Sequence, residues 1–204
     1  MSKNKINTKV LSGFVELLPQ QQLTFDTIKN IVETSYRSSG YVAIDTPVIE
    51  KSEVLFAKAG GDTEKQVYRF SKGYNDLSLR FDLTVPFARY VSEHYNDLFF
   101  PFKRYHIAKV YRGERAQKGR YREFYQADID VVAENELSVM YDVDIISTIA
   151  GTIENLSKLC NLGNFKMKIS NRKIWDGFFD EFSISGEQKA SIMNIIDKKA
   201  KITP

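Results

Sequence analysis

Hydrophobic residues recur at helical spacing in several parts of the chain. This periodicity predicts long helices over residues 19–38, 85–95 and 136–159. Pro19 stands at the start of the first helix, where proline is tolerated, and Ser38-Ser39-Gly40 ends it. Beyond residue 171 the pattern predicts two shorter helices, over 174–182 and 187–200.

Strand signals lie between these helices. Runs rich in β-branched and aromatic residues predict a long hairpin, whose strands span 104–113 and 122–132 and flank a polar loop. Most strands are joined by short turns, so we expect an α+β fold in which an antiparallel β-sheet is flanked by helices. Neither the Gly-x-Gly-x-x-Gly pattern nor the phosphate-binding P-loop pattern is present in the sequence. The remaining strands are predicted over 41–44, 66–71, 77–81 and 165–170, with a turn at 73–76.

Composition narrows the class of protein. The 204 residues, 43% of them hydrophobic, are enough for one domain, or for one domain and part of a second. The net charge of +3 is too small to indicate a general nucleic-acid-binding protein, so any cluster of basic residues that binds an anion must be local. The single cysteine, Cys160, excludes an internal disulfide and is predicted to pack in the core. We expect a cytoplasmic protein with no membrane partner and no metal site built from protein ligands, because the sequence offers no apolar span, no signal peptide and no zinc-ligand spacing.

The hairpin loop is strongly basic. Five basic residues lie between positions 112 and 122, and Glu114 is the acidic residue that opposes them. Guanidinium groups bind phosphate oxygens in a bidentate manner, which suits such a loop to a triphosphate. The charge run fits an ordinary solvated loop equally well, so composition leaves both interpretations open. The basic residues are Arg112, Arg115, Lys118, Arg120 and Arg122.

Alternation along the second hairpin strand favours a binding site. Phe124, Gln126, Asp128 and Asp130 fall on one face, while the residues between them are mainly apolar and are predicted to be packed. A ladder of an amide and two carboxylates headed by a phenylalanine is unusual for a solvated sheet face. If the polar face of the partner strand, which carries Arg112, coincides with it, one surface holds all of these groups.

A second polar signal precedes the helix predicted over 85–95. Thr84 fits the N-cap position of that helix, and Pro86 fits its first turn. Asp82 has no such structural explanation in the sequence, because it continues the preceding strand.

These segments together resemble the histidyl-tRNA synthetase family. Val110–Gln126, VYRGERAQKGRYREFYQ, resembles motif 2 of class II aminoacyl-tRNA synthetases in its histidyl form, and this match is long and specific. Leu79–Tyr90, LRFDLTVPFARY, resembles the histidine-binding strand and turn of the family. Gly40–Pro47 is similar to motif 1, and Ser170–Ile174 to the segment before the insertion region. The resemblance runs from about Gly13 to Phe182.

The resemblance implies a role for each residue of the basic loop. Arg112 would hold the α-phosphate of ATP and is the expected catalytic residue. Glu114 would contact the adenine side, Phe124 would stack on the ring and Arg120 would reach the outer phosphates. At the loop tip, Arg115 and Gln117 would meet the acceptor end of tRNA(His).

The resemblance also implies a histidine site. Asp82, Thr84 and Gln126 would bind the α-amino group, and Asp130 would accept a hydrogen bond from the imidazole. The implied reaction is ATP-dependent formation of histidyl-adenylate, assisted by Mg²⁺, followed by transfer to tRNA(His). Motif 1 implies a homodimer packed through residues 40–47.

Length and alternatives complete the sequence-based expectations. Residues 1–170 are expected to form the catalytic core, truncated at its C-terminal side, and 171–204 the helical start of the insertion region. The resemblance places motif 3 beyond residue 204, so the chain alone is expected to have little activity. Ala133 stands where the family usually has glycine. The alternatives are a synthetase-like regulatory subunit of ATP phosphoribosyltransferase, which tends to lose the motif 2 arginines, and a single-stranded RNA binder.

Overall fold

The computed structural model describes residues 6–57 and 61–202. The chain forms two compact units, Met1–Gly163 and Asn164–Pro204. The first unit contains both sheets and the candidate site, and the second is helical. Of the helices in the described ranges, none is long and apolar enough to cross a membrane.

A long antiparallel hairpin forms the centre of the first unit. Strands β5 (Phe102–Tyr111) and β6 (Glu123–Val132) pair along their whole length, with Ala108 opposite Gln126. This confirms the predicted hairpin. Strand β1 (Val42–Ala43) adds to β5 in parallel, so the sheet order is β1-β5-β6, and the parallel pairing is one that the sequence pattern did not indicate.

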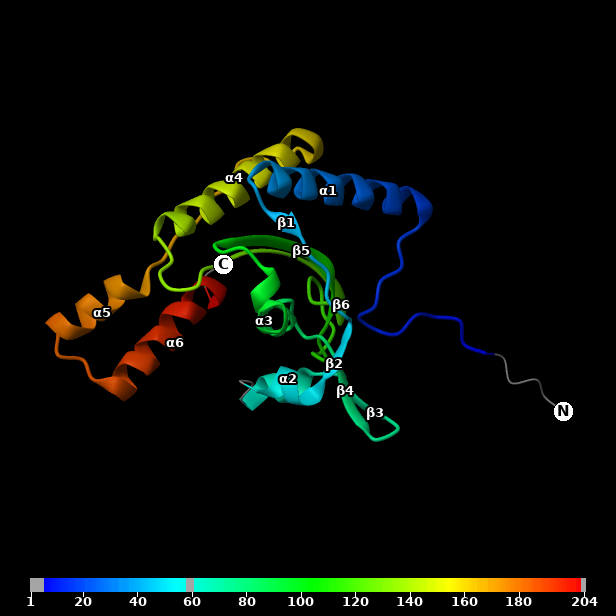
Figure 1. Cartoon of the computed structure of the whole chain (residues 1–204), viewed down its shortest axis with the longest axis horizontal. Helices are drawn as coiled ribbons and strands as arrows, with labels where there is room; N and C mark the ends of the chain where they lie inside the picture. Colours follow the sequence, from blue (N-terminus) through cyan, green and yellow to red (C-terminus); the bar gives the residue numbers. More distant parts are fainter. Residues whose placement is uncertain (1–5, 58–60, 203–204) are drawn as a thin grey trace. The chain divides into compact units, whose positions relative to one another are not determined.

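Two helices cover one face of this sheet. Helices α1 (Pro19–Ser38) and α4 (Met140–Cys160) pack against each other and lie on the same side of β5 (Figure 1). The buried core of this layer joins aromatic residues of the sheet region to the apolar stripe of α1. Burial of such side chains is the main force that holds helices on a sheet. Its members are Val32, Tyr36, Tyr41 and Tyr105, with Ile107, Ile129, Val131, Ile145 and Leu156 packed around them.

The opposite face of the hairpin is covered in part by α3 (Thr84–Glu93), which lies across β5 from α1 and α4 (Figure 1). Leu83 immediately precedes α3 and is fully buried against Ala108, Val110 and Phe124. This small apolar cluster attaches the start of α3 to the sheet.

A second sheet has the order β2-β4-β3 and is antiparallel throughout. Its strands are β2 (Ile49–Lys51), β3 (Arg69–Lys72) and β4 (Asn75–Leu79). Gly73 adopts a φ of 62° in the tight turn between β3 and β4, a conformation that glycine adopts without strain. The short helix α2 (Ser52–Phe56) packs on β4, and 3₁₀ turns follow at Gly61–Gln66 and Tyr95–Asp97.

The second unit consists of α5 (Arg172–Glu181) and α6 (Gly186–Ile202), as the periodicity predicted. The Asn171 side chain caps α5 by accepting a hydrogen bond from the Lys173 N–H at 2.9 Å. Phe179 is buried, and Lys189 forms an ion pair with Asp180 at 3.0 Å.

Three expectations are wrong in this region. Residues 165–170 form no strand, because alternation predicts a strand only where a neighbouring strand is present to pair with it. Helix α4 begins at Met140 and not at residue 136. Cys160, the last residue of α4, is exposed and does not pack in the core, because it lies at the end of the helix.

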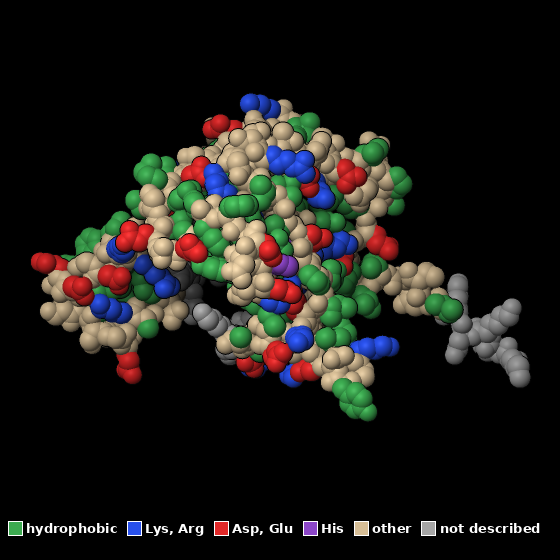
Figure 2. All heavy atoms as spheres, viewed as in Figure 1, with side chains coloured by type: hydrophobic (Ala, Val, Ile, Leu, Met, Phe, Trp, Pro, Cys, Tyr) green, Lys and Arg blue, Asp and Glu red, His purple; other side chains and the backbone are tan. Residues whose placement is uncertain are grey.

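Charged side chains of both signs are interspersed on the face of the molecule shown in Figure 2. This distribution matches the small net charge of +3. The basic residues that carry the argument for a phosphate site are therefore a local feature of one loop.

We predict that Leu83→Ala lowers the free energy of unfolding by about 2–5 kcal/mol, because it leaves a cavity beneath the start of α3. Urea denaturation followed by circular dichroism measures this change. Leu23→Ala, at an exposed position of α1, is the control and should change stability by less than about 0.5 kcal/mol. Equal effects of the two substitutions would contradict the packing described here.

Candidate active site

The register of the hairpin places the predicted polar residues on one face. Arg104 lies opposite Asp130, His106 opposite Asp128, and Val110 opposite Phe124. Since side chains alternate along a strand, Gln126 shares this face with its neighbours at positions 124, 128 and 130. The predicted coincidence of the two polar faces is confirmed.

Arg112 lies at the open end of this face, between two aromatic rings. Its guanidinium carbon is 4.5 Å from the centre of the Phe81 ring and 5.1 Å from that of Phe124. Its Nε also donates a hydrogen bond to the Phe81 carbonyl at 3.2 Å. Stacking and hydrogen bonding hold the guanidinium over the site before any ligand binds.

The loop after Arg112 is held by the segment that precedes α1. The Arg122 N–H donates to the Gly13 carbonyl at 2.7 Å, and the Arg122 Nε donates to the Glu114 carbonyl at 2.9 Å. Gly13 has a φ of 87°, and a Cβ there would lie 2.9 Å from Cγ of Arg122. Glycine at this position therefore permits the close approach that anchors the loop.

A cavity of about 380 Å³ opens between the loop and the sheet. Arg120 and Glu114 form an ion pair across it at 3.4 Å. The two guanidinium groups that line this cavity favour a ligand with an anionic group. The one carboxylate favours a ligand that also carries a hydrogen-bond donor. Arg115 and Gln117 are exposed near the loop tip. The cavity is lined by Arg112, Glu114, Gly119, Arg120, Tyr121 and Phe124.

Carboxylates gather at the other end of the face. Burial raises the pKa of the Asp128 carboxyl, the charges of Asp130 and Asp82 act in the same direction, and Arg104 and Arg112 oppose them. The charge of Asp82 acts on Asp128, so these two carboxylates lie near each other. The buried Oε1 of Gln126 has no hydrogen-bond partner among the described residues. A buried acceptor without a partner is costly, which points to a ligand that donates to it.

Asp82 and Thr84 differ in part from their predicted roles. Thr84 is the first residue of α3 and is exposed, so the prediction that it caps this helix is wrong. The cap comes from Asp82, whose Oδ1 accepts a hydrogen bond from the Val85 N–H at 3.1 Å. Asp82 therefore has a structural role that fixes its carboxylate, and one oxygen remains for a second contact.

Sequence reasoning missed the buried basic side chains on and beside this face. Arg104 is completely buried and forms an ion pair with Asp130. His106 is also buried, and its Nε2 donates to Asp45 Oδ1 at 2.9 Å. Arg80 donates to the Thr46 carbonyl at 2.7 Å and thereby ties the β1–β2 connection to the sheet. The alternation of side chains along the strand could have placed Arg104 and His106 on this face, because both are an even number of residues from Arg112.

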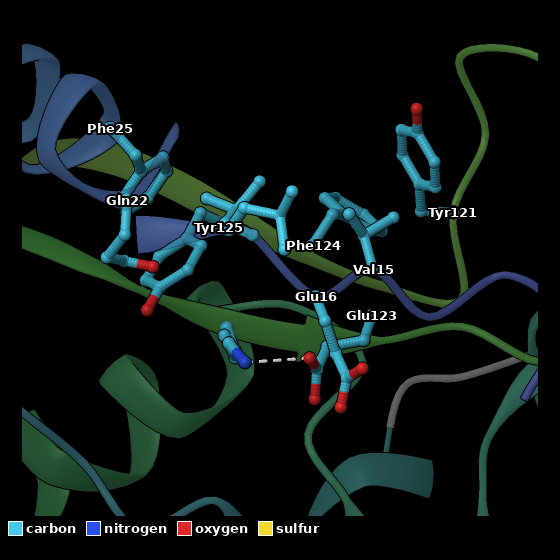
Figure 3. A pocket seen from close by; sticks show the side chains of 11 residues that line it. Val15, Glu16, Gln22, Phe25, Tyr121, Glu123, Phe124 and Tyr125 are labelled. Atoms are coloured by element: carbon cyan, nitrogen blue, oxygen red, sulfur yellow. Dashed lines mark hydrogen bonds and ion pairs between the residues drawn. The ribbon is translucent and has the colours of Figure 1, made fainter. Parts of the chain in front are cut away.

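A larger cavity, of about 770 Å³, lies beside β6 and the start of α1. Figure 3 shows Phe25 near Tyr125 at one end, with Glu16 and Glu123 together at the other. An ion pair joins Lys109 to Glu123 at 2.7 Å. Of the predicted site residues, only Phe124 lines this cavity, so we place the candidate active site on the polar face instead.

The family profile described as histidyl-tRNA synthetase matches residues 13–203. The chain belongs to the histidyl-tRNA synthetase family. It is 50% identical over 202 residues to the histidine–tRNA ligase of Clostridium tetani, with 99% of this chain and 45% of that protein covered. The corresponding protein of Clostridium acetobutylicum is 48% identical, with 98% and 45% covered. The chain thus spans about 45% of the length of these curated relatives.

Solved structures agree with the class II synthetase fold. The histidyl-tRNA synthetase of Nostoc sp. PCC 7120 superposes with a TM-score of 0.82 at 39% identity, over 94% of this chain and 43% of that one. A Bacillus halodurans protein, described as an ATP phosphoribosyltransferase regulatory subunit/histidyl-tRNA synthetase, gives 0.63 at 25% identity, over 74% and 39%. The α+β family fold predicted from the sequence is confirmed.

The burial of His106 generates a prediction about pH. Burial lowers the pKa of the His106 imidazole, although its bond to Asp45 opposes this effect. As the pH falls below about 6.5, the unfolded chain binds a proton that folded His106 does not, so the free energy of unfolding should decrease. His106→Gln should remove this part of the decrease between about pH 7.5 and pH 5.5, as measured by urea denaturation.

The control is His94→Gln, which replaces the other of the two histidines at a position where the side chain is 42% exposed. This variant keeps His106 in place, so the part of the decrease that His106 causes should remain. The account of His106 fails if both variants retain the full decrease in stability.

Proposed function

We propose that the chain carries the ATP- and histidine-binding part of a histidine–tRNA ligase, an aminoacyl-tRNA ligase that activates histidine and transfers it to tRNA(His). The observation that supports this most strongly is the single polar face of the β5–β6 hairpin. It holds a stacked arginine at one end and an unpartnered buried amide with carboxylates at the other. One end suits a phosphate and the other an ammonium or an N–H donor.

ATP would occupy the cavity beneath the loop. Arg112 would hold the α-phosphate, Arg120 the outer phosphates, and Phe124 would stack on the adenine with Glu114 at its edge. Mg²⁺ would be held chiefly by the phosphate oxygens, because Glu114 is the one carboxylate on this cavity, and the ion would neutralise phosphate charge. Arg115 and Gln117 would then be free to contact the acceptor end of tRNA(His).

Histidine would lie over the carboxylate end. Its α-ammonium would donate to Gln126 Oε1 and to the free oxygen of Asp82, with Thr84 beside them. Its imidazole N–H would donate to Asp130. Arg104 contacts Oδ2 of Asp130, which leaves Oδ1 to accept from the ligand.

The proposed first step is in-line attack of the histidine carboxylate on the α-phosphorus of ATP. One P–O bond forms, the bond to the β-phosphate oxygen breaks, and pyrophosphate leaves with the electron pair. The nucleophile is already ionised, so no general base is required. The residues supply position and charge neutralisation, and Arg112 lies at the junction of the two substrate sites.

The same site argues against the regulatory alternative. A synthetase-like regulatory subunit has no need for the motif 2 arginines, whereas Arg112 and Arg120 are present here and line one cavity.

Assembly is a further proposal. We expect a homodimer through residues 40–47, and sedimentation as a monomer in analytical ultracentrifugation would argue against it. We also propose that 171–204 begins an insertion region and that the protein acts in the cytoplasm.

Asp130→Ala tests the histidine site. It should weaken L-histidine binding by about 1.5–3 kcal/mol, the range of a hydrogen bond to a charged group, when measured by isothermal titration calorimetry. Binding of ATP should be unchanged. Glu154→Ala, at an exposed position of α4, is the matched control for loss of one carboxylate. Equal histidine affinity in the two variants would remove Asp130 from the site.

Histidine-dependent exchange of labelled pyrophosphate into ATP tests the activity. We expect residues 1–204 alone to exchange slowly. Arg112 and Arg120 are the two cations that line the cavity, and the resemblance places motif 3 outside residues 1–204. Loss of one electrostatic donor typically lowers the rate by about 10²–10³. The natural protein that carries this sequence should exchange readily, and its Arg112→Ala variant should not. Absence of exchange by the natural protein would refute the proposed activity.

A further inference from the structure

Arg104 lies at the carboxylate end of the polar face, opposite Asp130, and is completely buried. Its guanidinium carbon is 4.1 Å from the centre of the Phe87 ring, and its Nη2 pairs with Oδ2 of Asp130. Its three side-chain nitrogens have no further hydrogen-bond partner among the residues described. The cation is thus packed against an aromatic ring on one side and faces carboxylates on the other.

Two carboxylates of the same strand face lie next to Arg104. Asp130 is opposite Arg104 and forms an ion pair with it, and Asp128, two residues away on the same face, also acts electrostatically on the guanidinium. Arg112 is a second cation that acts on Asp128. Arg112 belongs to the phosphate end, where its guanidinium stacks on Phe81 and Phe124. Arg104 is therefore the fixed counter-ion of the Asp128–Asp130 pair.

Burial separates the two members of the ion pair. The side chain of Asp130 is 35% exposed, while that of Arg104 is 0% exposed. The carboxylate faces the site and the guanidinium lies beneath it. A ligand that donates to Asp130 would meet an oxygen whose position is set by a cation that the ligand itself does not touch.

We propose that Arg104 is a positioning residue for the amino-acid site, which holds the Asp130 carboxylate in place and serves as the shared counter-ion of Asp128 and Asp130. This inference rests on the proposed function, because it assigns Asp130 to the histidine side chain. It adds to that function the charge balance on which recognition depends.

The physical consequence of losing Arg104 is specific. Two neighbouring carboxylates that lack a cation repel each other, and one of them binds a proton more readily. Removal of one partner from a buried ion pair is strongly unfavourable, whereas removal of both charges together is often tolerated. If Arg104 acts through its charge, removal of the Asp128 charge should restore the histidine affinity that is lost with Arg104. If Arg104 acts only by filling space, removal of the Asp128 charge should restore nothing.

The experiment compares Arg104→Met, Arg104→Lys, Asp128→Asn and the double variant Arg104→Met/Asp128→Asn with the unsubstituted chain. L-Histidine and ATP affinities are measured by calorimetry, and the Asp128 and Asp130 carboxyl carbons are titrated by NMR in the ligand-free proteins. We expect Arg104→Met to weaken histidine binding about tenfold or more, with ATP affinity changed less than about twofold. The double variant should recover most of the histidine affinity, and Arg104→Lys should retain much of it.

The titration gives a readout that does not depend on ligand binding. Arg104→Met should raise the pKa of the Asp128 carboxyl, and Arg104→Lys should raise it less, because Arg104 opposes the rise that burial causes there. If Arg104→Met does not fold, the Lys variant and the double variant carry the test, because both should fold. Failure of the double variant to fold would overturn the proposal.

The outcomes separate this inference from the proposed function. Unchanged histidine affinity in Arg104→Met would overturn the inference and leave the function standing. A second outcome would also overturn the inference. If Arg104→Met weakens histidine binding, the double variant does not recover it and the carboxyl titration does not change, then Arg104 has only a packing role. No histidine binding by the unsubstituted chain, with the titration shifted as expected, would count against the function and support the counter-ion assignment.

Discussion

The antiparallel pairing of β5 with β6 is the constraint on which both the core and the candidate site depend. Ten residues on each strand are in register, so each of these residues has a defined partner on the other strand, and partners lie on the same face of the sheet. A shift of β6 by one residue would move Ile129 and Val131 out of the core and bring Gln126 and Asp128 into it. The apolar layer beneath α1 and α4 therefore fixes the polar face, because the wrong register would bury carboxylates against hydrophobic side chains.

The polar face changes character along its length. At the open end, Arg112 is held by aromatic stacking and lies beside a cavity open to solvent, where a phosphate can replace water around the cation. At the other end, Arg104 is buried, so its charge interacts more strongly with the neighbouring carboxylates and is paired with Asp130 within the protein. The hairpin thus joins a hydrated cationic region to a partly dehydrated carboxylate region along a single strand pair.

Local patterns in the sequence were sufficient for the hairpin, the longer helices and the identity of the residues on the polar face, but they did not predict the short helix α2 or strand β2. They were not sufficient for features that depend on long-range packing. The parallel pairing of β1 with β5 joins segments far apart in the chain, and residues 165–170 alternate like a strand although they have no partner. Asp82 was assigned to the strand because nothing local showed that its carboxylate caps α3. The family resemblance supplied the roles that we propose for these residues, and the structure supplied their burial.

Arg104 shows why burial could not be inferred from residue type. Arginine is seldom fully buried, and on a sequence pattern it reads as a solvent-facing residue of a strand. Here the opposite holds, because α3 covers this part of β5 and brings Phe87 over the guanidinium. The helix that Asp82 caps is also the element that buries the cation paired with Asp130. Capping, burial and charge pairing therefore meet at one helix: the start of α3 is fixed by Asp82, and the same helix packs Phe87 against the cation that pairs with Asp130.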